Sequence, residues 1–195
     1  MIKIGILGDI GSGKSFIAKQ FGYPVFNADK EVSDIYKKDK ACYKKIKKKF
    51  PKFIKSKTLK KDELGSVIKA NKKNLKKISD IVHPIVRKRM HVFFKKNKSK
   101  KMVILDIPLL VENKLYDKKF YLIFVQSNKN EINKRLKKRL FYNKSIINSL
   151  RKSQRDLSYK KKISNFVIKN NFKLQTVKKN IKIIKKKILN ERNSS

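Results

Sequence analysis

The sequence feature that most constrains the fold is a glycine-rich segment close to the N-terminus. Residues 8–15, GDIGSGKS, fit the pattern G-x-x-x-x-G-K-[ST] of the phosphate-binding P-loop. The β-branched run at 2–7 is typical of a buried strand, and Ile17 and Phe21 have the spacing of a helix over 15–21. Strand, glycine loop and helix is the order that this motif requires, which argues against a chance turn. The sequence therefore predicts a nucleotide-binding α/β protein.

Each residue type in this segment has a physical role in binding a phosphate chain. Glycines adopt backbone angles that a Cβ forbids, so successive N–H groups can turn toward one anion. The helix that follows adds its unpaired N–H groups and the positive end of its dipole. Lys14 can reach the β- and γ-phosphates, and the Ser15 hydroxyl can bind Mg²⁺, although a plain helix cap is the alternative for Ser15. The residues expected to contact ATP here are Gly8, Gly11, Ser12, Gly13, Lys14, Ser15 and Phe16.

Length and composition fit one cytoplasmic domain. The chain has 195 residues, of which 39% are hydrophobic, enough for a single core. Its one cysteine, Cys42, excludes a disulfide within the chain and fits a reducing compartment. We expect no signal peptide, because the first residues form a strand, and no membrane span, because no apolar run approaches about 18 residues. Nothing in the sequence indicates an oligomeric state.

The formal net charge of +41 has two interpretations. It could mark a protein that binds RNA or DNA, or lysine could fill ordinary solvent-facing positions. The lysines are spread along almost the whole chain while Gly, Pro and Trp are scarce, which favours the second interpretation and leaves non-specific nucleic-acid binding as a side effect. Only seven of the 55 basic residues are arginine, so each arginine is a candidate for a position that needs a planar guanidinium.

Short buried strands alternate with helical segments along the rest of the chain. Strands are expected at residues 25–26, 101–106, 121–125 and 165–168, and residues 107–112 are expected to continue the second of these. Helices are expected from Lys30, over 62–77, from Ile81 with Pro84 in the first turn, after Asn128, from Ser145 to beyond Leu157, and from Leu174. The alternation predicts a parallel sheet flanked by helices.

The spacing of these elements predicts three parts within one P-loop domain. The helical pair at about 58–98 is long for a simple crossover, so we interpret it as an inserted subdomain. The arginine-bearing helix after Asn128, a break and another helix, at about 128–159, look like the lid of a nucleotide kinase. The core then comprises about 1–57, 99–127 and 160–190, although the lysine-rich residues 40–60 indicate no particular structure.

Two acidic residues follow strands of the expected sheet. Because ligands of open α/β sheets bind at the carboxyl ends of the strands, Asp29 and Asp106 can lie beside the P-loop. Asp106 could hold Mg²⁺, for instance through a water molecule, or cap the turn that follows. Asp29 could be a catalytic carboxylate or the N-cap of the next helix, and its position alone favours the cap.

Several short motifs occur together in a fixed order along the chain: residues 8–15, 27–29, 83–84, 106–112, 135–139, Gln154 and 167–171. On these motifs the chain resembles, from Ile2 to about Lys186, the dephospho-coenzyme A kinase family. The Pro-Leu-Leu-Val-Glu run and the upstream His-Pro are more specific than the P-loop, which many families share. The resemblance implies Mg²⁺-dependent transfer of the γ-phosphoryl group of ATP to the ribose 3′-hydroxyl of dephospho-coenzyme A.

The resemblance also implies roles for individual residues. Asp29 corresponds to the carboxylate that orients or deprotonates the acceptor hydroxyl. Arg139 is placed near ATP and Arg135 in the lid, with a solvated helix face as the alternative for both. The acceptor pocket is expected to include His83, Pro108, Leu109 and Leu110, for which a structural histidine and core side chains are the alternatives.

The sequence departs from the family pattern at two places. Asn27 stands where the family usually has aspartate, which removes a carboxylate that could assist Mg²⁺ or water binding. Leu150 stands where an arginine is expected four residues before Gln154, and Arg151 follows one place later. Two competing functions remain open at this point: another small-molecule P-loop kinase, such as a nucleoside or nucleotide kinase, and a basic nucleic-acid-binding NTPase.

Overall fold

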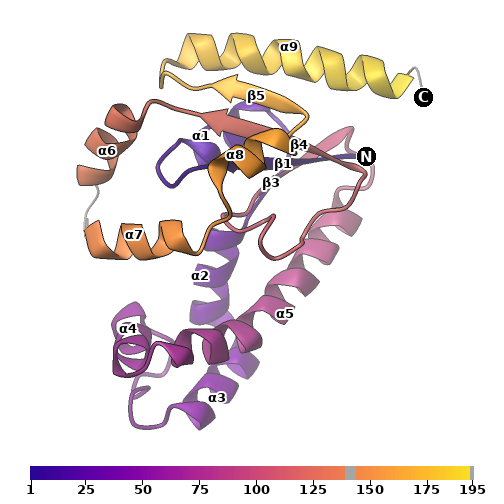
Figure 1. Cartoon of the computed structure of the whole chain (residues 1–195). Helices are drawn as coiled ribbons and strands as arrows, with labels where there is room; N and C mark the ends of the chain where they lie inside the picture. Colours follow the sequence, from indigo (N-terminus) through magenta and orange to yellow (C-terminus); the bar gives the residue numbers. More distant parts are fainter. Residues whose placement is uncertain (139–143, 194–195) are drawn as a thin grey trace. The chain divides into compact units, whose positions relative to one another are not determined.

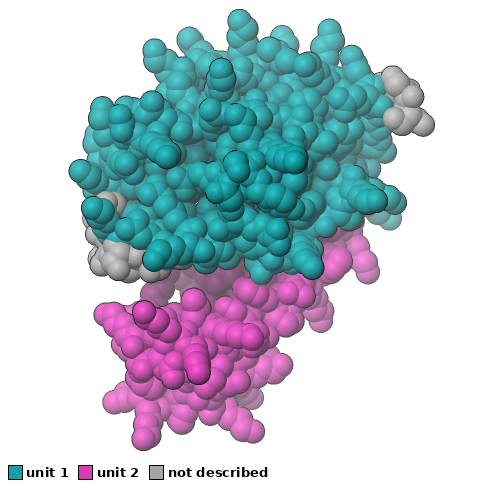
Figure 2. Space-filling model, viewed as in Figure 1, with its two compact units in different colours: residues 1–27, 97–195 teal, residues 28–96 magenta. Residues whose placement is uncertain are grey.

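The computed structural model describes residues 1–138 and 144–193, and the chain divides into two compact units. Residues 1–27 and 97–195 form the first, which we call the sheet unit, and residues 28–96 form the second, the helical unit (Figure 2). The helical unit thus begins at Ala28, directly after the second strand, whereas the inserted subdomain was expected to begin near residue 58. Each unit is described by itself below.

The sheet unit is built on five parallel strands (Figure 1). They are β1 (Ile2–Gly8), β2 (Val25–Asn27), β3 (Met102–Asp106), β4 (Phe120–Gln126) and β5 (Phe166–Lys169), in the spatial order β2-β3-β1-β4-β5. All five lie where the sequence predicts strands, because each is a short apolar run bounded by polar or turn residues. The prediction of a parallel α/β sheet flanked by helices is confirmed.

The register brings the carboxyl ends of the strands to one edge. Gly8 at the end of β1 pairs with Val125 of β4, and Asn27 at the end of β2 pairs with Asp106 of β3. Alternate residues of β1 face opposite sides of the sheet. One side packs against α1 (Lys14–Gln20) and α9 (Leu174–Asn193), and the side chains that fill this core include Ile4, Ile6, Ile17, Phe21, Val177, Ile181, Ile184 and Ile188.

The helices between β4 and β5 are shorter than the sequence suggests. They are α6 (Lys129–Lys137), α7 (Lys144–Lys152) and α8 (Leu157–Lys162). Asn128 caps α6 as predicted, since its side chain accepts a hydrogen bond from the Asn130 amide at 2.8 Å. The single helix expected from Ser145 to beyond Leu157 is wrong: Asp156 caps a separate helix by accepting from the Ser158 amide.

The segment after β3 is a turn, so the prediction that residues 107–112 continue the strand is wrong. Pro108 has no N–H to donate to a sheet ladder. Instead the Leu110 amide donates to the Ile107 carbonyl at 3.3 Å, and the Leu115 amide donates to the Leu110 carbonyl at 3.0 Å. Leu110 is fully buried over Gly5, where any Cβ would collide with the leucine side chain. The apolar run is buried because it covers the sheet, and periodicity alone cannot distinguish this from a strand.

The helical unit consists of α2 (Ala28–Lys38), α3 (Lys40–Lys49), α4 (Lys61–Ala70) and α5 (Lys73–Lys96). The prediction that Pro84 opens a helix is wrong, because Pro84 lies inside α5. The break falls at Asn71, whose side chain accepts from the Lys73 amide at 2.8 Å. The buried residues Ile78, Val82, Val86 and Met90 form one continuous stripe on both sides of the proline. Packing of this stripe outweighs the backbone hydrogen bond that Pro84 cannot donate.

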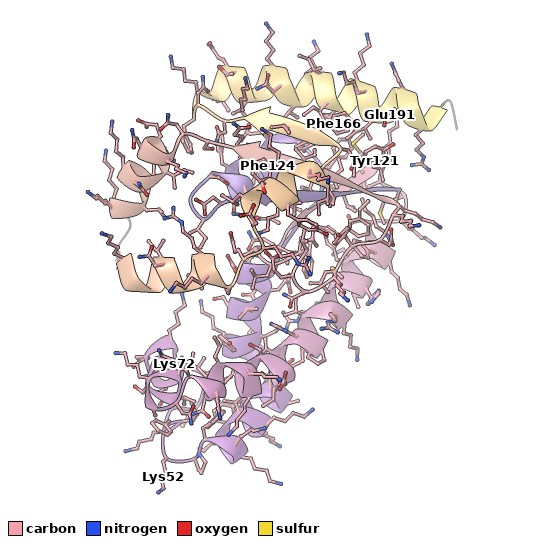
Figure 3. The ribbon with its side chains drawn as sticks, viewed as in Figure 1. Lys52, Lys72, Tyr121, Phe124, Phe166 and Glu191 are labelled. Carbon is pink, nitrogen blue, oxygen red and sulfur yellow. The ribbon has the colours of Figure 1, made fainter. Side chains whose placement is uncertain are left out.

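The lysine side chains lie mainly outside these cores. Lys52 and Lys72 of the helical unit are exposed and are labelled in Figure 3. One exception is Lys160 of α8, which is 1% exposed. Its Nζ lies 2.8 Å from Oε1 of Glu112 in the turn after β3, and the same oxygen accepts from the Arg155 amide at 2.7 Å. Burial raises the pKa of Glu112, but hydrogen bonds from Lys160 and from backbone amides outweigh it, so the pKa lies below its ordinary value.

This ion pair predicts a pH-dependent contribution to stability. A lowered carboxyl pKa stabilises the fold above the ordinary value of about 4.5, and the contribution is lost as the pH falls through the pKa of the folded state. At pH 7, Glu112→Gln should lower the free energy of unfolding by about 3 kcal/mol, because Lys160 would remain buried without a counter-charge. The difference from wild type should shrink on acidification below pH 4.5, as measured by urea unfolding.

The control is the partly exposed pair of Lys3 and Asp117, whose charged atoms lie 4.0 Å apart. Asp117→Asn should cost less than about 1 kcal/mol at either pH. An equal cost for both variants at pH 7 would contradict a stabilising role for the buried pair.

Candidate functional site

The P-loop backbone has the conformation that its glycines predict. Gly8, Gly11 and Gly13 have φ values of 146°, 83° and 91°, all in the region that side chains rarely adopt. Gly13 is also sterically required, because a Cβ there would lie 2.5 Å from Nδ2 of Asn170. The loop leaves β1 at Gly8 and enters α1 at Lys14, so the amides of the first turn of α1 follow it directly.

Two polar side chains from other strands hold the loop at the Ser12 carbonyl. Oγ of Ser127, just after β4, donates to this carbonyl at 2.9 Å, and Nδ2 of Asn170, just after β5, donates at 2.8 Å. The backbone of Asn170 is itself fixed, since its main-chain N–H donates to the Gln126 carbonyl at 2.8 Å. Neither residue is among those expected to bind ATP, although Asn170 lies in the run at 167–171 that carries the family resemblance. Their position directly after strands of a parallel sheet is the signal that could have identified them.

The side chains of the loop point in different directions. Nζ of Lys14 donates to the carbonyls of Gly8 and Asp9, at 3.1 and 2.8 Å, and so lies back over the loop. Ser15 and Phe16 are exposed in the first turn of α1. The N-cap of α1 is Gly13, which removes a plain N-cap as the role of Ser15. Ser12 is fully buried, and its Oγ has no hydrogen-bond partner among the described residues.

Asp106 and Asn27 form a pair at the ends of two neighbouring strands. Nδ2 of Asn27 donates to Oδ2 of Asp106 at 2.6 Å, and Asp106 is 3% exposed. A carboxylate at position 27 would face Asp106 across the same pair of strands and repel it. The amide instead satisfies one carboxylate oxygen, so the departure from the family pattern has a structural counterpart.

Two arginines of the expected lid contact the region of the P-loop. Arg151 of α7 pairs with Asp9, its NH2 group lying 3.1 Å from Oδ2. Arg135 of α6 is exposed and lies over the ring of Phe172, 4.3 Å from the ring centre. Phe172 has a φ of 62° and its ring packs near Gly13. Arg139 lies outside the described residues, and the role expected for it stays a prediction.

The residues expected to bind the acceptor lie in both units. Asp29 is the second residue of α2 and lies inside its first turn, so it is not the N-cap. His83 is half-buried in α5. Burial and the nearby Arg87 lower the pKa of His83 more than Asp80 raises it, which favours the neutral imidazole at pH 7. In the sheet unit, Pro108 and Leu109 are half-buried whereas Leu110 is a core residue.

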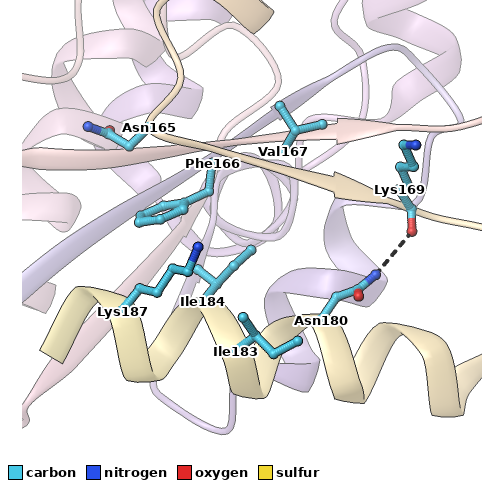
Figure 4. A pocket seen from close by; sticks show the side chains of 8 residues that line it. All are labelled: Asn165, Phe166, Val167, Lys169, Asn180, Ile183, Ile184 and Lys187. Atoms are coloured by element: carbon cyan, nitrogen blue, oxygen red, sulfur yellow. Dashed lines mark hydrogen bonds between the residues drawn. The ribbon is translucent and has the colours of Figure 1, made fainter. Parts of the chain in front are cut away.

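A separate groove of about 440 Å³ lies between β5 and α9 (Figure 4). Its lining residues are Asn165, Phe166, Val167, Lys169, Asn180, Ile183, Ile184 and Lys187, none of which is a predicted site residue. Beside it, the rings of Phe166 and Tyr121 stack with centres 6.2 Å apart, in the region of Glu191 (Figure 3). Burial and the Glu191 carboxylate raise the pKa of Tyr121. The groove offers aliphatic surface and lysines, with no acid–base pair for catalysis.

Comparison with known proteins gives one consistent family. A family model described as dephospho-CoA kinase matches residues 2–176. The dephospho-CoA kinase of Wolbachia pipientis wMel is 32% identical over 170 residues, covering 85% of this chain and 87% of that protein. Of the helices in the described part of the chain, none combines the length and apolarity needed to cross a membrane.

Solved structures agree with the sequence comparisons on the fold. TT1252 from Thermus thermophilus has a TM-score of 0.76 and 25% identity, with 97% of both chains covered. A dephospho-CoA kinase from Campylobacter jejuni has a TM-score of 0.64 and 23% identity, covering 95% of this chain and 96% of that one. The resemblance predicted from the sequence motifs is therefore confirmed.

The buried hydroxyl of Ser12 makes a testable prediction about the loop. Ser12→Ala should leave the free energy of unfolding unchanged or raise it by about 1 kcal/mol, because it removes a buried polar group without a partner. Affinity for Mg·ADP should stay within about threefold, whereas Lys14→Ala should weaken it at least about tenfold through loss of a charge-assisted contact. Thermal unfolding and calorimetric titration measure both quantities. A loss of affinity in Ser12→Ala as large as in Lys14→Ala would show that the hydroxyl itself binds nucleotide.

Proposed function

The chain belongs to the dephospho-CoA kinase family, and we propose that it transfers the γ-phosphoryl group of ATP to the ribose 3′-hydroxyl of dephospho-CoA, giving CoA and ADP. The observation that carries the proposal is the family match from residue 2 to 176 together with a P-loop whose glycines have the required backbone angles. The same match disfavours a nucleoside or nucleotide kinase, and a nucleic-acid-binding NTPase has only the charge of +41 in its support.

The donor nucleotide would be held by the P-loop. The backbone amides of residues 8–16 and the Lys14 ammonium would bind the phosphates, and positioning plus charge neutralisation supplies most of the catalysis in phosphoryl transfer. Mg²⁺, when bound, would neutralise negative charge on the phosphates. The exposed Ser15 hydroxyl and, through water, the Asp106 carboxylate are oxygen donors of the kind that this ion prefers.

The acceptor hydroxyl would be oriented by Asp29. This carboxylate follows the end of β2 by two residues, and Asn27 at that end is bonded to Asp106. A carboxylate can accept the hydroxyl proton while remaining hydrogen-bonded to the nucleophile. His83, Pro108, Leu109 and Leu110 would contribute to the acceptor pocket, the first as a neutral hydrogen-bonding group.

We further propose the division of the domain given by the sequence. Residues 58–98 would form an acceptor-binding insertion and residues 128–159 a lid, with Arg135 and Arg139 closing over the nucleotide. The reaction would take place in the cytoplasm, in keeping with a single cysteine in the chain, and without a specific nucleic-acid partner.

A coupled assay with ATP, Mg²⁺ and dephospho-CoA tests the activity directly. ADP should form with dephospho-CoA and not with nucleosides or nucleoside monophosphates as acceptors, since the family match is to dephospho-CoA kinase. Turnover with any of those acceptors and none with dephospho-CoA would support the other kinase class. Stimulation of ATP turnover by RNA at physiological salt, with dephospho-CoA inert, would support the nucleic-acid-binding class.

The role of Asp29 can be separated from a structural one. Asp29→Asn should lower kcat by about 100-fold or more, because it removes the proton acceptor, while ATP affinity stays unchanged. The matched control is Asp34→Asn, which makes the same charge change on the same helix and should leave kcat within about twofold. A normal kcat with a lowered melting temperature in Asp29→Asn would assign Asp29 to helix stability alone.

A further inference from the structure

The P-loop of this chain carries a carboxylate, and that carboxylate is paired. Asp9 follows Gly8, so its side chain originates inside the loop that the proposed function assigns to a triphosphate. Its side chain is 13% exposed. Oδ1 accepts from the Ile10 amide at 2.6 Å, which fixes the carboxylate in place. A fixed anion here opposes the binding of another anion.

Arg151 supplies the opposite charge from a distant part of the sequence. Its Nε lies 3.3 Å from Oδ1 of Asp9, and its NH2 group lies 3.1 Å from Oδ2. The guanidinium thus contacts both carboxylate oxygens, a geometry that arginine provides and lysine does not. The side chain of Arg151 is 35% exposed, so the pair is partly shielded from solvent. The contact also fixes α7 at the P-loop.

We propose that Arg151 is a positioning residue whose function is to neutralise Asp9, so that a P-loop containing a carboxylate still binds ATP. The inference rests on the proposed nucleotide site and adds to it a dependence of donor affinity on α7. It differs from direct phosphate binding by Arg151, because it requires Asp9 to be present. Lys14 donates to the main-chain carbonyls of Gly8 and Asp9, whereas Arg151 contacts the Asp9 carboxylate, so the two cations bind different groups of the same short segment.

A double-mutant cycle tests the proposal by titrating Mg·ADP into wild type, Asp9→Asn, Arg151→Gln and the double variant. Arg151→Gln should weaken binding at least about tenfold, because the Asp9 carboxylate, no longer paired, repels the phosphates. Asp9→Asn should bind at least as tightly as wild type. The double variant should return to within about threefold of Asp9→Asn, because the charge that needs neutralising is gone.

Two results would overturn the proposal. One is an equal loss from Arg151→Gln with and without Asp9, which would make Arg151 a direct phosphate ligand. The other is no loss at all in Arg151→Gln. Lys152→Gln is the matched control, since it removes the same charge from the neighbouring exposed position and should leave affinity within about twofold. If Arg151→Gln melts below the assay temperature, Arg151→Lys replaces it and should lose less than about tenfold, since the charge remains.

The readout is independent of the acceptor reaction. Binding of Mg·ADP needs no dephospho-CoA, so a failure to phosphorylate that acceptor leaves the cycle interpretable. Conversely, the kinase could be active while the effects of the Asp9 and Arg151 substitutions on Mg·ADP affinity simply add. That result would contradict the proposal for Arg151 and leave the proposed function in place.

Discussion

The two hydrogen bonds to the Ser12 carbonyl are the interaction on which the rest of the site depends. Glycines make the loop conformation possible, but the same freedom leaves it unspecified in the absence of other contacts. Ser127 and Asn170 come from the ends of β4 and β5, so the loop is fixed only when these strands have joined β1. The parallel sheet therefore does more than carry the loop, since its register determines where the loop carbonyl is held.

Much of this arrangement could be predicted from the sequence, and the exceptions share a cause. The strands and the P-loop follow from short apolar runs and from glycine positions, which are local signals. The turn after β3, the continuous α5 and the separate α8 depend on tertiary contacts. Leu110 packs over Gly5, and the buried stripe of α5 passes Pro84 without a break. Lys160 can be buried because Glu112 faces it, and the six residues of α8 carry no pattern that would reveal a partner so distant in the sequence.

Arginine and lysine have different roles in this chain. Lysine dominates the surface, yet several described arginines make contacts that use a flat or forked cation. Arg151 contacts both oxygens of Asp9, Arg135 lies over Phe172, and Arg155 lies over Tyr159 at 5.2 Å. Such geometry could not be assigned from the sequence, because the partners lie up to 142 positions away. The sequence could nevertheless indicate arginine as the residue type to expect at such contacts, because it is rare among the basic residues.

Carboxylates are scarce in this chain. Those of the sheet unit that lie close to the P-loop or to the ends of the strands accept hydrogen bonds from neighbouring side chains. Glu112 is paired with Lys160 and Asp9 with Arg151, whereas Asp106 accepts a hydrogen bond from the neutral amide of Asn27, which adds no second carboxylate at that strand end. A polyphosphate site tolerates a fixed negative charge only when that charge is neutralised or is shared with a cation. An unspecific excess of lysine cannot do this, because surface charge is screened within about 10 Å at moderate salt. The local pairs, rather than the net charge of +41, are therefore the electrostatic features that a nucleotide at the P-loop would encounter.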